Sequence, residues 1–161
     1  MALTDLTNKT EEEIIDISIA PIKKQKFRIN GDPNKVIELN LTDINIASRM
    51  EEGLKNIAEH IQKLSEINMN EQDATSQIKE IDKNIRKEVD FIFDYPVSDK
   101  CSDGGTMVDP KNGVLRYEHI MESLLSMYAK SIQNEYRKLN NRIKKHTEKY
   151  TAPKKTSRDK K

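Results

Sequence analysis

The sequence contains few of the residues that restrict or interrupt a fold. Among its 161 residues there are one cysteine, five glycines, five prolines and no tryptophan. A single cysteine excludes an internal disulfide framework, and the scarcity of glycine and proline allows long segments to stay helical. No apolar run approaches the roughly 20 residues of a membrane span, and the first residues lack the pattern of a secretory signal. We therefore expect a protein that does not enter a membrane and stays inside the cell that makes it.

Charge is abundant but unevenly distributed along the chain. Charged residues make up 34% of the sequence and hydrophobic residues 35%, which indicates a thin core and well-solvated helices. The formal net charge is only +1, yet residues 137–161 contain eleven Lys or Arg and two acidic residues. The remaining residues, 1–136, are correspondingly acidic. The chain thus joins an acidic body to a basic end, which is suited to attracting an acidic partner.

Three short segments alternate apolar and polar residues, which is the pattern of strands with one buried face. They lie at residues 15–19, 27–29 and 37–41. Between the last two segments, residues 30–34 read Asn-Gly-Asp-Pro-Asn, a composition typical of a turn. We expect residues 26–41 to form a β-hairpin. With the first segment, the N-terminal part would form a small hairpin or a three-stranded sheet.

The apolar period then changes from two residues to between three and four, which predicts helices. Two apolar stripes follow, consisting of Ile46, Met50, Leu54, Ile57, Ile61 and Leu64, and of Ala74, Ile78, Ile81, Ile85, Val89 and Ile92. Because only a short polar link separates the stripes, we expect an antiparallel helix pair. Phe91, Phe93 and Tyr95 cluster at the end of the second helix. We expect this cluster to anchor the core against the β-hairpin.

The rest of the chain divides into a loop, a long helix and a tail. Residues 96–115 form the only long irregular stretch that we expect. A third stripe predicts a helix over residues 116–146 and consists of Tyr117, Met121, Leu124, Tyr128, Ile132, Tyr136, Leu139 and Ile143. At 1.5 Å per residue this helix spans about 45 Å, so its far end should project from a compact domain.

These elements predict the domain organisation and the fold class. Residues 1–22 should form an N-terminal arm with a short strand, and residues 23–146 a single domain of hairpin and helices. Residues 147–161 have few apolar side chains and should form a disordered basic tail. The fold class is α+β and predominantly α, with the small N-terminal sheet packed on the antiparallel helix pair and the long C-terminal helix.

The loop is the best place to look for catalytic or metal-binding residues. Asp99, Cys101 and Asp103 imitate the start of an EF-hand calcium loop, but Pro110 stands where the bidentate glutamate belongs. Cys101 and His119 could be a nucleophile and its base, but nothing in the sequence orients the histidine. We favour an ordinary turn and a half-buried thiol. We expect no enzyme activity, no catalytic residue, no metal ligand and no cofactor.

The order of elements resembles that of the tail assembly chaperones of long-tailed, siphovirus-type bacteriophages of Gram-positive hosts. The matching features are the strand-turn-strand segment 27–41, the charged helix pair that runs into residues 88–93, a glycine-containing loop, a long last helix and a basic end with residues 149–153. The similarity covers residues 23–155. It implies a non-catalytic protein that binds tape-measure protein, tail-tube protein or both. Such a protein keeps them competent for assembly in the cytoplasm of the infected host.

The basic end supplies the candidate partner-binding residues. They are Lys144, Lys145, Lys149, Tyr150, Lys154, Lys155 and Arg158. We expect these residues to attract an acidic protein segment, and self-association is a further expectation. Nucleic acid is not an expected partner, because the acidic body would repel phosphate. Two alternatives stay open: a structural protein retained in the virion, and a regulator that binds nucleic acid through its basic tail.

Overall fold

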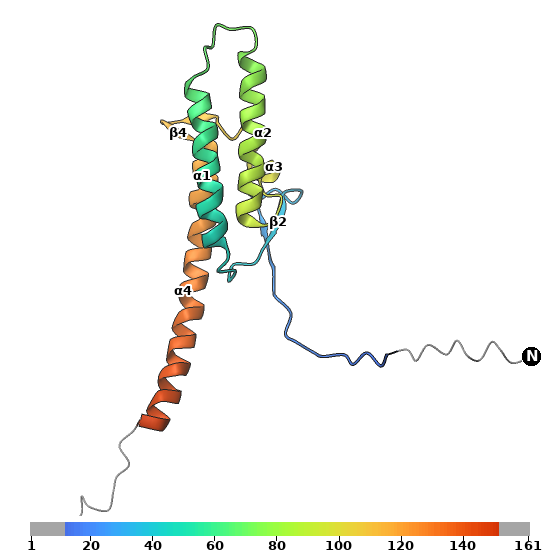
Figure 1. Cartoon of the computed structure of the whole chain (residues 1–161), viewed down its shortest axis with the longest axis vertical. Helices are drawn as coiled ribbons and strands as arrows, with labels where there is room; N and C mark the ends of the chain where they lie inside the picture. The colour runs from blue at the N-terminus through green and yellow to red at the C-terminus, as the bar shows by residue number, and fades with distance from the viewer. Residues whose placement is uncertain (1–11, 152–161) are drawn as a thin grey trace, which may run out of the picture.

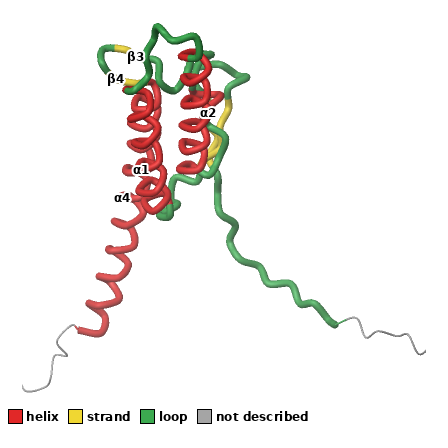
Figure 2. Tube along the Cα trace, turned by 45° about the horizontal axis from the view of Figure 1, so that its top comes forward, coloured by secondary structure: helices red, strands yellow, loops and turns green. Residues whose placement is uncertain are grey.

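The chain folds into a mainly helical body from which two extensions leave (Figure 1). The computed structural model describes residues 12–151. The fold is α+β and predominantly α, with an N-terminal hairpin, an antiparallel helix pair and a long last helix. Figure 2 shows the long helix and the N-terminal segment diverging from the same end of the body. No helix in the described range combines the length and the apolar character that crossing a bilayer requires.

The N-terminal hairpin consists of β1 (Gln25–Arg28) and β2 (Val36–Leu39), which pair antiparallel. Ile37 and Leu39 of β2 are buried against the helices, whereas β1 is exposed except for one half-buried side chain. The hairpin predicted over residues 26–41 is therefore confirmed, with both strands shifted by one or two residues toward the N-terminus of the chain.

The turn of this hairpin is set by its sequence. Asn30 and Gly31 adopt positive φ values of 51° and 74°, which glycine, and to a lesser degree asparagine, adopt at low cost. The Asp32 side chain then accepts a hydrogen bond from the backbone N–H of Asn34 at 2.9 Å. These local interactions account for the reversal of the chain between the two strands.

The helix pair consists of α1 (Ile46–Ser65) and α2 (Ala74–Phe93), and it forms the main contact of the body. Gly53 lies in the contact: a Cβ atom added there would stand 2.5 Å from Cγ1 of Ile92. Glycine costs about 1 kcal/mol inside a helix relative to alanine. Here it allows the two helices to approach more closely than any larger residue would permit.

The long helix α4 (Arg116–Thr151) packs only its first half on the helix pair and the hairpin. The α4 side chains buried in this contact are Ile120, Met121, Leu124 and Tyr128. The ring of Tyr128 lies 5.9 Å from that of Phe93, centroid to centroid. One continuous core thus joins the hairpin, the helix pair and the first half of α4.

The segment expected to be irregular contains short ordered elements. They are α3 (Ser98–Cys101), β3 (Pro110–Lys111) and β4 (Val114–Leu115), and the two strands form a second small hairpin. Met107 in this segment is fully buried. The loop is therefore part of the body and covers one end of the core.

The strand predicted at residues 15–19 is absent. Residues 12–24 have no regular structure, and the sheet at this end of the described chain has two strands rather than three. The alternating pattern is present in the sequence, but a strand needs a neighbouring edge to pair with. In this structure the segment runs away from β1 (Figure 1).

The prediction for Phe91 is wrong, and that for Phe93 is confirmed. Phe93 is 3% exposed and lies in the core, whereas Phe91 is 40% exposed. The reason is the helical period: Phe93 follows Val89 by four residues and shares its buried face, whereas Phe91 lies on the outer face of α2. Two residues that are two positions apart in a helix lie on different faces of it.

The boundary between α4 and the basic tail also differs from the prediction. The helix was expected to end at residue 146, but it continues to Thr151. Residues 147–151, assigned to the disordered tail, are therefore helical. The rest of the predicted tail, 152–161, lies outside the described residues.

Candidate functional site

The second half of α4 extends beyond the body with its side chains in solvent. Every side chain from Gln133 to Glu148 is exposed. Tyr136, Leu139 and Ile143 are nevertheless apolar, and they are 47%, 39% and 51% exposed. They continue the seam that buries the first half of the helix. We call residues 133–151 the projecting half of α4.

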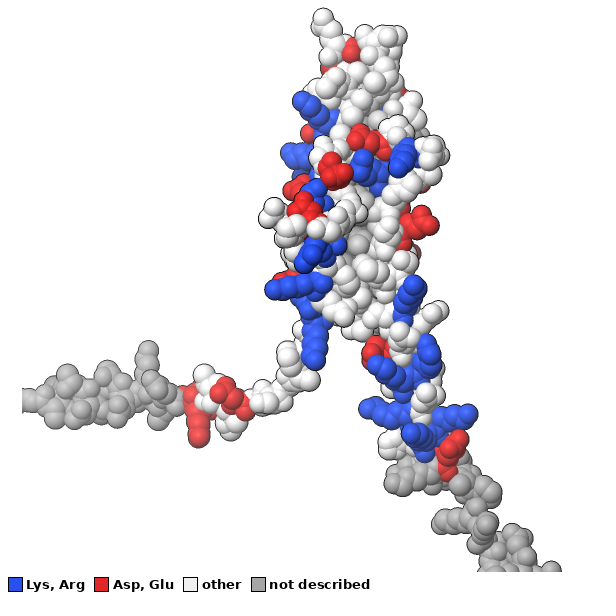
Figure 3. All heavy atoms as spheres, turned by 180° about the vertical axis from the view of Figure 1, so that it is seen from behind, with Lys and Arg blue, Asp and Glu red and all other residues white. Residues whose placement is uncertain are grey.

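The projecting half is also basic. Residues 133–148 contain five Lys or Arg and two Glu, and Figure 3 shows Lys and Arg gathered there. Lys138 pairs with Glu135 at 3.3 Å, and Arg137 donates to the side-chain oxygen of Asn134 at 2.7 Å. Such exposed contacts contribute little to stability. The arrangement leaves a net positive charge beside an uncovered apolar seam.

The predicted partner-binding residues lie on this half or beyond it. The side chains of Lys144 and Lys145 are exposed on the projecting half. Lys149 and Tyr150 belong to the last turn of α4. The other three, Lys154, Lys155 and Arg158, lie outside the described residues. Sequence reasoning located the basic end and the apolar stripe and predicted that the far end of the helix projects. It did not single out the exposed stripe as a binding surface, because the period alone does not reveal where the covering helices stop.

The loop between α2 and α4 is held by one arginine that sequence reasoning did not single out. Arg86 donates hydrogen bonds to Asp82 at 3.0 Å, to Asp99 at 2.8 Å and to the carbonyl of Gly105 at 2.6 Å. The other oxygen of Asp82 accepts from the backbone N–H of Met107 at 2.7 Å. The sequence signal was an Asp and an Arg four residues apart on α2, which is common on helix surfaces.

The carboxylates of the EF-hand-like stretch do not converge on a common point. Asp99 faces Arg86, and Asp103 pairs with Lys35 of the hairpin turn at 2.9 Å. The hydrogen bond from Lys35 holds the pKa of Asp103 below its usual value. No cluster of three or more potential ligands occurs among the residues that the structure describes. These acids fasten the loop to the hairpin and to α2.

Cys101 is half-buried at the end of α3. Burial, and then the charge of Asp90, raise the pKa of the Cys101 thiol to about 11. A thiol with this pKa is protonated at neutral pH and is a poor nucleophile. Asp90 itself accepts hydrogen bonds from the N–H and the hydroxyl of Ser98, at 2.8 and 3.0 Å, and so holds the start of α3. Burial nonetheless raises the pKa of Asp90.

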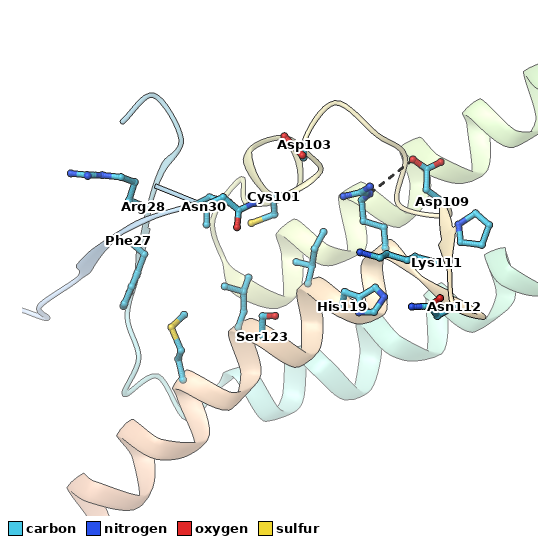
Figure 4. Close-up of a pocket in the computed structure, with 16 residues that line it drawn as sticks. Phe27, Arg28, Asn30, Cys101, Asp103, Asp109, Lys111, Asn112, His119 and Ser123 are labelled. Carbon is cyan, nitrogen blue, oxygen red and sulfur yellow. Dashed lines mark ion pairs between the residues drawn. The ribbon is translucent and has the colours of Figure 1, made fainter. Parts of the chain in front are cut away.

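A groove separates β1 from the first half of α4. Its volume is about 810 Å³. Figure 4 shows Phe27 on β1 at one side and His119 and Ser123 on α4 at the other. The groove floor is apolar and consists of Phe27, Ile29, Cys101, Ile120, Leu124 and Met127. The rim is polar and includes Arg28, Asp109, Lys111 and Arg116.

Cys101 and His119 both line this groove, but the structure records no hydrogen bond between them. Asp109 on the rim accepts hydrogen bonds from the hydroxyl and the N–H of Thr106, at 2.6 and 3.0 Å, which hold the pKa of Asp109 below its usual value. Nε of Arg116 lies 4.0 Å from the Asp109 carboxylate, too far for a hydrogen bond. The groove is therefore better suited to accepting apolar side chains than to polarising a substrate.

Comparisons with protein-family models, curated protein sequences and solved structures gave no match to this chain.

Proposed function

We propose that this chain is a phage tail assembly chaperone: a non-catalytic protein-binding factor that keeps tape-measure or tail-tube protein competent for assembly in the host cytoplasm. The observation that carries the proposal is the projecting half of α4. There an apolar seam lies in solvent along a helix and is accompanied by excess positive charge. A surface of this kind is suited to binding a partner protein.

The spacing of the seam favours a helical partner. From Ile132, through Tyr136 and Leu139, to Ile143, the steps are four, three and four residues, the alternation that lets two helices pack side by side. A solvated helix of this length is marginally stable in water, because helices draw most of their stability from packing. A partner helix laid along the seam would supply that packing.

The charge of the projecting half favours an acidic partner. Basic side chains beside the seam accelerate encounter with an acidic segment and disfavour a basic one. The resemblance of this chain to tail assembly chaperones implies a long helical partner, the tape-measure protein. The proposed complex therefore pairs the seam of α4 with an acidic amphipathic helix of that protein.

The first test is whether a tape-measure gene lies next to the gene for this chain, and the second is co-expression and titration with the protein which that gene encodes. The variant Leu139→Glu/Ile143→Glu places two charges in the seam. Its matched control, Asn134→Glu/Asn141→Glu, places the same two charges on the opposite face of the helix. We expect the seam variant to bind roughly tenfold more weakly or worse, and the control to bind like the unmodified chain.

Three results would count against this proposal. Equal binding by the seam variant and its control would show that the projecting half of α4 is not the contact. Stoichiometric presence of the chain in purified particles, measured by mass spectrometry, would instead favour a structural virion protein. Binding to duplex DNA with a steep dependence on salt would favour a nucleic-acid-binding regulator.

A further inference from the structure

The segment that precedes the hairpin exposes more isoleucine than any other part of the described chain. Ile14, Ile15, Ile17, Ile19 and Ile22 are between 74% and 89% exposed. Ile15, Ile17 and Ile19 alternate with Asp16 and Ser18, so in an extended conformation they share one face. From here on, the arm means residues 12–24, the described part of the chain that precedes β1. An extended segment with one apolar face has the properties of a strand without a sheet.

The hairpin has a free edge that fits such a strand. The N–H of Ile29 donates to the carbonyl of Lys35 at 2.9 Å, which sets the alternation of hydrogen bonds along the hairpin. By that alternation, Lys26 and Arg28 direct their N–H and C=O groups away from β2. On the opposite edge, the carbonyl of Val36 already accepts a hydrogen bond from Lys100 at 2.6 Å. The open edge is therefore that of β1.

The groove lies beside this same edge. Its described lining comes from residues 27–30, from the loop and from α4, with no residue of β2. A strand added to β1 would send every second side chain toward the apolar floor between β1 and α4. The edge supplies backbone hydrogen bonds, and the groove accepts apolar side chains.

The charges of the arm and of the groove rim also bear on this contact. Glu12, Glu13 and Asp16 make the first half of the arm acidic, whereas Lys23 and Lys24 lie at its other end, next to β1. The edge and rim carry Lys26, Arg28, Lys111 and Arg116. Asp103 at the rim pairs with Lys35 at 2.9 Å, and Asp109 lies 4.0 Å from Arg116. Lys26 pairs with Glu38 of β2 at 3.7 Å, so the positive charge available to an added strand is mainly that of Arg28 and Lys111. An acidic strand is thus attracted to this edge.

We infer that the arm of one copy of this chain adds as a strand to the free edge of β1 in a second copy, with its three alternating isoleucines in the groove. The arm leaves its own body rather than folding back (Figure 1). Pro21 holds the preceding residue extended, which disfavours a tight reversal between the arm and β1. Two copies that exchange arms make the same contact twice and form a closed dimer. This inference does not rest on the proposed function.

The first test is the mass of the full-length chain in solution, measured by size-exclusion chromatography with light scattering. The expected species has twice the 18.6 kDa of one chain. Ile17→Ser/Ile19→Ser removes two groove-facing side chains and should raise the dimer dissociation constant roughly tenfold or more. Ile14→Ser/Ile22→Ser makes the same chemical change outside the alternating set and should leave the dimer intact. A monomeric unmodified chain, or equal effects of the two variants, would overturn the inference.

A second pair of variants tests the edge rather than the arm. Lys26→Pro removes an N–H that points away from β2, so the hairpin itself loses no hydrogen bond. It should dissociate the dimer, whereas Lys26→Ala should not. Circular dichroism would verify that both variants keep their helix content. Leu139→Glu/Ile143→Glu should also stay dimeric, which separates arm exchange from association through α4. Dissociation by that variant would place the contact elsewhere and refute arm exchange.

Cross-linking distinguishes exchange between copies from folding back within one chain. In a Cys101→Ser background, chains with Ile17→Cys are mixed with chains with Arg28→Cys and treated with a flexible bismaleimide. Exchange predicts a covalent dimer from the mixture, well above the amount formed by either variant alone. If the double variant Ile17→Cys/Arg28→Cys instead links within one chain and the mixture yields no dimer, the arm occupies its own groove and the inference is wrong.

Discussion

The two halves of α4 share one helix and one apolar seam, yet only the first half is covered. Leu124 and Leu139 both belong to this seam, and they are 5% and 39% exposed. Their sequence pattern is the same, so the difference in exposure comes from their neighbours. The helix pair and the hairpin cover Leu124, but α4 continues beyond them, and Leu139 is left in solvent. The lesson is that periodicity identifies which face of a helix is apolar, whereas tertiary packing determines whether that face is already occupied.

Truncation of one leucine in each half of α4 tests this difference in packing and should have the largest effect. Leu124→Ala should lower the free energy of unfolding by about 2–5 kcal/mol, because it leaves a cavity in the core. Leu139→Ala should change it by less than about 1 kcal/mol, because a side chain already in solvent leaves no cavity. Chemical denaturation of the two variants measures both values under the same conditions.

Helix propensity does not distinguish the two variants. Both substitutions replace leucine with alanine in the same helix, so their effects on helix propensity largely cancel. Similar losses of stability in the two variants would mean that the projecting half is buried in solution. In that case, association along the seam would have to be measured before the values are interpreted.

Much of the fold could be predicted because its elements have clear periods. The hairpin and both helices of the pair were located from alternation and from helical spacing, and the turn from residues 30–34. The prediction failed where a pattern depends on a neighbour. Residues 15–19 alternate like a strand but have no paired edge, and Phe91 was placed by proximity to Phe93 rather than by its angle on the helix.

The loop and the candidate site were harder to predict for the same physical reason. Arg86 donates hydrogen bonds to Asp82, Asp99 and Gly105, and the last of these lies 19 residues from Arg86 in the chain. Glycine is unfavourable inside a helix, and the reason for Gly53 in α1 is visible only from its close approach to Ile92 of α2. The basic end was predicted from composition and the projection of the last helix from its length, whereas the point at which its apolar seam becomes exposed required the three-dimensional arrangement.

Cys101, which is half-buried in the body, should make a smaller contribution to stability that depends on pH. Its pKa in the folded chain is about 11 against an ordinary 9.0. Unfolding exposes the thiol, which then loses its proton more readily. The contribution of the protonated Cys101 thiol to stability is therefore fully present below pH 9 and is lost as the pH rises through 11. Between these values, the unmodified chain should lose up to about 2 kcal/mol more stability than Cys101→Ser.

The measurement is urea denaturation of both chains at several pH values between 8 and 11. Lysine and tyrosine residues titrate in both proteins, so the difference between the two curves isolates the cysteine. Parallel curves would show that Cys101 is solvated. A steeper loss in Cys101→Ser would reverse the assigned direction of the pKa shift.

The smallest expected effect on stability comes from removing residues 147–161. This deletion takes the last turn of α4, and the preceding side chains from residue 133 onward are already exposed. The free energy of unfolding should change by less than about 0.5 kcal/mol. Partner binding should weaken, because the removed residues contain six Lys or Arg and two acids. The loss should be largest at low salt, since exposed charges are screened beyond about 10 Å at 0.1 M.

A full-length variant separates the effect of charge from that of length. Lys154→Gln, Lys155→Gln and Arg158→Gln together remove three charges without shortening the chain. If charge attracts the partner, this variant should retain the melting temperature, lose part of the affinity, and approach the unmodified chain as salt rises. An affinity equal to that of the unmodified chain at every salt concentration would attribute binding to the apolar seam alone. A large drop in melting temperature on deletion would instead mean that the projecting half of α4 contributes to the body, which its exposure argues against.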